Sequence, residues 1–167
     1  WTFHGHEDVG ARMVPKIFRR LKLPLNEKMR YVQKLVRLHQ RPIALAAGEV
    51  SDSAIRRLVV EADEDLEDLL TLCRADITTR DARREARYLR NYDALEERIR
   101  HVQERDRLRN WQPPLDGKDI MTAYNVPPCY AVGRIKEAIR EAILEGEIAN
   151  EREAAQAYME RIAPAIL

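Results

Sequence analysis

Hydrophobic side chains recur every three or four residues along most of the chain, a spacing that places them on one face of a helix. The pattern predicts four helices within residues 1–78, the first over about 6–21. Their apolar stripes are, in chain order, His6, Val9, Met13 and Ile17; Val32, Leu35, Val36 and His39; Ile55, Leu58 and Val59; and Leu66, Leu69, Leu70, Cys73 and Asp76. Pro24 and Asn26 separate the first two helices. Pro42 is expected to end the second, and Ser51 or Asp52 to cap the third.

A longer helix is predicted for residues 79–109, because Tyr88, Tyr92, Leu95, Ile99 and Val102 are spaced alternately four and three residues apart. Such a seam packs against other helices along its length. The QPP sequence at residues 112–114 then breaks the chain, and shorter helices are predicted at 117–124, 131–145 and 151–162. We therefore expect an all-α fold. It would comprise a helical bundle in residues 1–78, a long connecting helix in 79–111 and a three-helix C-terminal module in 112–167.

Charged residues make up 34% of the chain and aromatic residues only 6%, a composition typical of helical proteins. The sequence shows no membrane span and no signal peptide, so we expect a cytoplasmic protein without membrane contact. Cys73 and Cys129 have neither metal-site spacing nor a disulfide pattern. The sequence also lacks a glycine-rich phosphate loop and a nucleophile elbow, so we expect no catalytic residue within this chain.

Positive charge is concentrated near the start of the chain, where residues 12–41 contain ten Lys or Arg and a single acid, Glu27. Such clusters bind phosphate groups without reading base sequence, so we predict a nucleic-acid-binding surface. The candidate residues are Arg12, Lys16, Arg19 and Arg20 on the first helix, Lys34, Arg37 and Arg41 on the second, Arg83 and Arg87 on the long helix, and Arg134 and Lys136 beside Gly133. For the long helix the alternative is a solvated face, interleaved with Asp81 and Glu85.

Three residues with metal-ligating side chains, His6, His39 and Asp76, each lie on the apolar stripe of a different predicted helix. We expect all three to point into the bundle, where together they would supply part of a metal shell. The alternative is that the histidines are hydrogen-bonded core residues and that Asp76 pairs with Arg74 or Arg80, because a buried carboxylate without a partner is costly.

Five segments of the chain resemble the C-terminal half of bacterial tRNA nucleotidyltransferases of the CCA-adding enzyme and poly(A) polymerase family, in members that carry an HD domain. The segments are HGHEDVGA, KMRYVQKLVRLHQRPIAL, TLCRADIT, RDRLRNWQPPLDGKDIM and VGRIKEAIREAILEGEI. The resemblance implies that His6, His39 and Asp76 are the retained part of the HD metal pattern. The earlier His and the His-Asp pair of that pattern have no counterpart here, so the resemblance implies an incomplete site in an excised fragment.

The resemblance also implies an activity for the parent enzyme, which would add nucleotides to tRNA 3′ ends from CTP and ATP, with Mg held by a head domain absent from this chain. This chain would be the tRNA-binding body and tail, inactive alone. In the tail turn PPCYAVG, Cys129 replaces the glycine expected there. Two alternatives are an HD-type, metal-dependent phosphohydrolase acting on nucleotides and a non-catalytic helical interaction module. The choice between CCA, partial CCA and poly(A) addition stays open, as does the oligomeric state.

Overall fold

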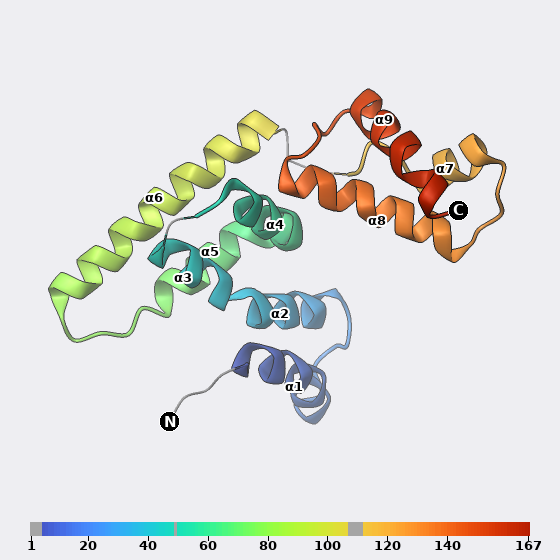
Figure 1. The fold of residues 1–167 in the computed structure, drawn as a ribbon. Helices are drawn as coiled ribbons and strands as arrows, with labels where there is room; N and C mark the ends of the chain where they lie inside the picture. Colours follow the sequence, from blue (N-terminus) through green and yellow to red (C-terminus); the bar gives the residue numbers. More distant parts are fainter. Residues whose placement is uncertain (1–4, 49, 107–111) are drawn as a thin grey trace. The chain divides into compact units, whose positions relative to one another are not determined.

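The computed structural model describes residues 5–48, 50–106 and 112–167 (Figure 1). Within these ranges the chain forms helices and contains no strand, so the predicted all-α fold is confirmed. The chain divides into two compact units, residues 1–101 and 102–167. The division falls inside the predicted connecting helix, most of which therefore belongs to the N-terminal unit.

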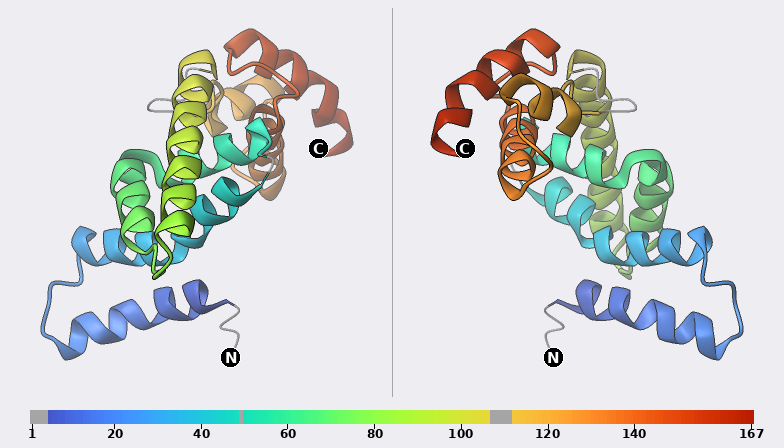
Figure 2. Two further views of the ribbon diagram at one scale, coloured as in Figure 1. Left: turned by 90° about the vertical axis from the view of Figure 1, so that its left-hand side faces the viewer. Right: turned by 90° about the vertical axis from the view of Figure 1, so that its right-hand side faces the viewer.

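The N-terminal unit begins with a hairpin of helices α1 (His6–Arg20) and α2 (Glu27–Leu38), which lie side by side in both orientations of Figure 2. Ala11 and Val14 of α1 are buried, as are Leu35 and Leu38 of α2. Gly10 permits a close approach of the two helices, since a Cβ atom at this position would lie 2.9 Å from Cγ1 of Val36. Small side chains on α1 therefore form its contact with α2.

Three members of the predicted apolar stripe of α1 lie outside this contact. Val9, Met13 and Ile17 are 47%, 50% and 38% exposed. The expectation that this stripe faces the bundle is therefore wrong for Val9, Met13 and Ile17. The physical reason is the size of the side chains. Gly10, Ala11 and Val14 have smaller side chains and let a neighbouring helix pack closely, whereas the larger side chains of the stripe would hold it further away.

Pro15 lies in the middle of α1 without ending it. A proline has no N–H, so the carbonyl of Ala11, four residues earlier, loses its helical donor. The side-chain amide of Gln33 on α2 donates to that carbonyl oxygen at 2.8 Å. The hairpin thus supplies the hydrogen bond that the proline removes.

A short helix, α3 (Gln40–Ala47), follows α2 after a break at His39 and was not predicted. Pro42 is buried in the first turn of α3, where its missing N–H is tolerated. In a helix continuing through residue 42, the N–H of that residue would bond to the carbonyl of Leu38. Proline has no N–H, so the helix breaks after Leu38, ahead of the proline. The prediction that Pro42 ends the second helix therefore places the break a few residues too late.

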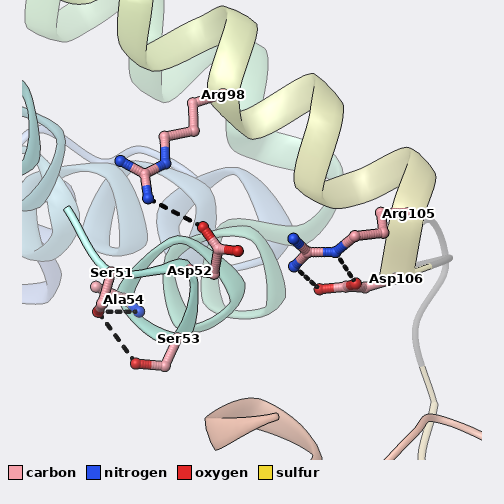
Figure 3. A network of polar contacts seen from close by, with 7 residues as sticks. All are labelled: Ser51, Asp52, Ser53, Ala54, Arg98, Arg105 and Asp106. Carbon is pink, nitrogen blue, oxygen red and sulfur yellow. Dashed lines mark hydrogen bonds and ion pairs between the residues drawn. The ribbon is translucent and has the colours of Figure 1, made fainter.

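The rest of this unit consists of α4 (Asp52–Ala62), the 3₁₀ turn η1 (Asp63–Asp65), α5 (Leu66–Ala75) and the first part of α6 (Ala82–Asp106). Ser51 caps α4 by accepting the N–H of Ala54 at 3.2 Å, while Asp52 accepts a hydrogen bond from Arg98 of α6 at 3.1 Å (Figure 3). Arg74 of α5 pairs with Asp93 and Glu96, also on α6. These contacts fix α6 against α4 and α5.

The seam predicted for the long helix is buried from its second member onward, because Tyr92, Leu95, Ile99 and Val102 are at most 4% exposed. Tyr88 is 40% exposed and falls outside the buried part. The part of this prediction that covers residues 107–109 lies outside the described residues.

The C-terminal unit contains α7 (Gly117–Tyr124), α8 (Tyr130–Glu145), α9 (Arg152–Ile162) and the turn η2 (Ala163–Ala165). The three predicted helices agree with α7, α8 and α9 to within one residue at each end. Asp116 and Asp119 cap α7 reciprocally. The core side chains come from all three helices and from the segments beside them: Leu115, Ile120, Val132, Ile135, Ile139, Ile143, Ala155, Met159 and Ala163. In the described part of the chain no helix has the length and apolarity to cross a bilayer.

Candidate nucleic-acid interface

One cationic surface of the N-terminal unit lies on α1. Arg12, Lys16, Arg19 and Arg20 are all exposed. Spacings of four and three residues place the first three of them in one row along the helix. Among the described residues, the structure gives these four side chains no hydrogen bond and no ion pair with an acid. Their positive charge is therefore available to an external anion.

The basic side chains predicted on the second helix differ from one another. Lys34 pairs with Asp65 at 2.7 Å, and Arg41 pairs with Glu61 at 2.6 Å. Arg37 is exposed and has no acidic partner among the described residues. A phosphate approaching Lys34 or Arg41 must compete with a carboxylate already in contact, so these two are weaker candidates than Arg37. The acidic partners, Asp65 and Glu61, lie in segment 61–65. The sequence pattern did not place this segment beside the basic helices.

The start of α6 carries a second cationic surface, because every residue from 81 to 90 is exposed. Arg83 has no acidic partner in the described chain, and Arg87 lies over the ring of Tyr88, 5.4 Å from its centroid. Arg84 lies 3.6 Å from Asp81, so part of this face matches the solvated-face alternative. Arg83 and Arg87 remain available for anion contact.

In the C-terminal unit, Arg134 and Lys136 are exposed on α8 and have no acidic partner among the described residues. A Cβ atom at Gly133 would meet nothing within 4 Å, so the helix surface beside them is open. Cys129, which replaces the expected glycine, has φ −150° and ψ 170°. Any residue adopts that extended conformation, so the cysteine introduces no backbone strain here.

The two predicted metal-ligating histidines lie together. Nε2 of His6 and Nε2 of His39 are 3.0 Å apart, and the amide nitrogen of Gln40 lies 3.3 Å and 3.1 Å from them. His39 Nδ1 lies 2.6 Å from the carbonyl oxygen of Val36. Because a carbonyl only accepts, Nδ1 of His39 carries the proton of this hydrogen bond. The pair is partly open to solvent, since the His6 side chain is 44% exposed.

Asp76 does not join this pair, and the prediction that it points into the bundle is wrong. Asp76 is exposed and is the C-cap residue of α5. Cys73, one turn earlier, takes the inward position and donates its S–H to the carbonyl of His39 at 3.0 Å. Within the described residues no group of three or more His, Cys, Asp or Glu side chains is arranged to hold a metal ion. The residues present therefore do not complete a metal shell.

Asp76 also does not make its alternative partnership with Arg74, which pairs with Asp93 and Glu96 instead. It lines a largely apolar cavity of about 210 Å³, together with Cys73 and Tyr92. Burial, with the negative charge of Asp76 adding to it, raises the pKa of Cys73 to about 12. The Cys73 thiol is therefore protonated at neutral pH and is a poor nucleophile.

Comparison with known proteins relates this chain to a tRNA nucleotidyltransferase. No protein-family model matches the chain, and no solved structure matches it. An A-adding tRNA nucleotidyltransferase from Deinococcus radiodurans is 33% identical over 165 residues, which is 96% of this chain and 35% of that protein. The chain thus spans about a third of the length of this relative. By sequence, the chain is related to a tRNA nucleotidyltransferase.

Proposed function

We propose that this chain binds and positions tRNA for a nucleotidyltransferase that adds nucleotides to the tRNA 3′ end. The observation that carries the proposal is the exposed row of Arg12, Lys16 and Arg19 on α1, whose charges have no acidic partner among the described residues. The relation to an A-adding tRNA nucleotidyltransferase indicates that the polyanion bound by this row would be tRNA. Arg37, Arg83, Arg87, Arg134 and Lys136 would add further phosphate contacts.

Binding of this kind depends on electrostatics, so the chain itself contributes affinity and orientation rather than a reacting group. We propose that the polymerising site, with its Mg and its CTP or ATP, belongs to other parts of the longer parent protein, and that this chain alone does not add nucleotides. In the longer protein, weakening the row on α1 should raise KM for tRNA with little change in kcat, because the contact is equal in the ground and transition states.

The test measures tRNA binding by two variants, each of which removes three positive charges. In the first, Arg12, Lys16 and Arg19 are changed to Gln; in the second, Arg140, Arg152 and Arg161, which already pair with acids, are changed to Gln. The slope of log K for tRNA binding against log salt should decrease in magnitude by about 2.1–2.7 in the first variant, at roughly 0.7–0.9 per lost phosphate contact. An equal loss in both variants would mean that only net charge matters, and unchanged binding in the first would refute the row on α1.

The histidine pair favours a second candidate function, that of an HD-type phosphohydrolase. We propose His6 and His39 as the two nitrogen ligands of a divalent ion, on the ground of their Nε2 atoms 3.0 Å apart. The Glu7 carboxylate lies 3.6 Å from Nδ1 of His6, but within the described residues no group of three or more ligand-type side chains is arranged to hold a metal ion, so we derive no hydrolytic step. Metal analysis of the purified chain and of His39→Ala tests it: equal metal content in both refutes the site, whatever the activity toward cyclic nucleotides.

A further inference from the structure

Tyr130, the first residue of α8, has an aromatic ring that the fold does not use. It is 84% exposed, the largest exposed fraction given for any large hydrophobic side chain among the described residues. Tyr124 and Tyr158, on α7 and α9, instead pack against the core of the same unit. The ring at position 130 therefore adds little to the stability of this unit and is accessible to a ligand.

The surface beside this ring suits a nucleotide. Gly133 and Arg134 follow Tyr130 by three and four residues, so they lie on the same face of α8. Gly133 leaves open space on that face, and the Arg134 guanidinium has no acidic partner in the described chain. The first turn of α8 contains no acid that would repel a phosphate. An exposed aromatic plane, a gap and a free cation are thus arranged along one helical turn.

We propose that Tyr130 stacks on an unpaired base of the bound tRNA while Arg134 neutralises a phosphate of the same strand. The inference rests on the proposed tRNA-binding function and deepens it by assigning a base-contacting residue to the C-terminal unit. Unpaired bases present their faces to aromatic side chains, whereas bases within a duplex are already stacked. Tyr130 therefore makes the chain select tRNA, with its unpaired loops and end, over a plain duplex.

The experiment measures the binding of a tRNA transcript, at one salt concentration, to the wild-type chain and to three variants of Tyr130. Tyr130→Ala and Tyr130→Leu should bind about 5- to 100-fold more weakly, because stacking on each base is lost, while Tyr130→Phe should match the wild type. The leucine variant retains apolar surface without the aromatic plane. Affinity for a fully paired RNA of similar length should be the same for all four proteins. Thermal unfolding followed by circular dichroism should show the four melting alike.

Salt titrations separate stacking from charge. Tyr130→Ala should leave the slope of log K against log salt unchanged, whereas Arg134→Gln should reduce it by about 1. If the wild-type chain binds tRNA and Tyr130→Ala binds equally well, the stacking proposal is overturned and the proposed function stands. Equal weakening by Tyr130→Phe would also overturn it, since the hydroxyl would then be the contact. If the wild-type chain does not bind tRNA, both proposals fail.

Discussion

The side-chain amide of Gln33 donates a 2.8 Å hydrogen bond to the carbonyl oxygen of Ala11, the group that Pro15 leaves without its helical donor. The contact joins α1 to α2 at the level of the proline. It explains how α1 continues through a residue that ordinarily breaks a helix.

Changing Gln33 to Leu should lower the free energy of unfolding by about 1–2 kcal/mol, since the partly buried Ala11 carbonyl loses its donor. In a Pro15→Ala background the backbone N–H of residue 15 is restored and bonds to the same carbonyl. The cost of Gln33→Leu should therefore be smaller in that background, as urea denaturation of the four proteins would show. Equal costs in both backgrounds would contradict the proposed role of Gln33.

Changing Gly10 to Ala should destabilise the hairpin by about 1–3 kcal/mol, because the new Cβ atom would lie 2.9 Å from Val36 in a packed contact. Gly133→Ala is the matched control at an exposed position of α8, where the new Cβ meets nothing. There the higher helix propensity of alanine should add up to about 1 kcal/mol. Thermal denaturation of both variants measures the two effects, and a stabilised Gly10→Ala protein would refute the close packing of α1 on α2.

Truncation of Val14 should reduce stability more than truncation of Ile17. The hydrophobic pattern, which places Ile17 on the packed face, predicts the reverse. Val14 is 6% exposed and Ile17 is 38% exposed. Val14→Ala should cost roughly 2 kcal/mol through lost burial and a cavity, and Ile17→Ala less than about 1 kcal/mol. Chemical denaturation curves measure both losses. A larger loss at Ile17 would show that the apolar stripe of α1 faces the bundle after all.

The capping box of α7 should make stability depend on acid pH through Asp119. Hydrogen bonds from the backbone of Asp116 and from the Arg152 guanidinium hold the pKa of Asp119 below its ordinary value of 3.8. A depressed folded-state pKa stabilises the protein above the unfolded value, and this contribution is lost as pH falls through the folded-state value. Asp119→Asn should therefore flatten the pH dependence of the melting temperature below about pH 4. An unchanged profile would contradict the assignment.

Several features of the candidate site could be predicted from local sequence. The periodicity located α7, α8 and α9, because helix period, capping residues and prolines act over a few neighbouring residues. It also singled out His6 and His39, whose Nε2 atoms meet across the hairpin. Lys34 and Arg41 could not be separated from Arg37 in this way. Their acidic partners, Asp65 and Glu61, are distant in sequence and come close only when α2 and α3 pack on the rest of the unit.

The sequence by itself determined the helical class, the helix bounds of the C-terminal unit and the concentration of positive charge near the start of the chain. Only the tertiary structure decided which face of α1 is buried, that Asp76 is exposed at the C-cap of α5, and that Tyr130 is left exposed. The physical reason is that periodicity tells which residues share a face, whereas the choice of the face that packs depends on how closely another helix can approach. On α1 the small residues Gly10 and Ala11 allow that approach, and the larger apolar residues remain outside.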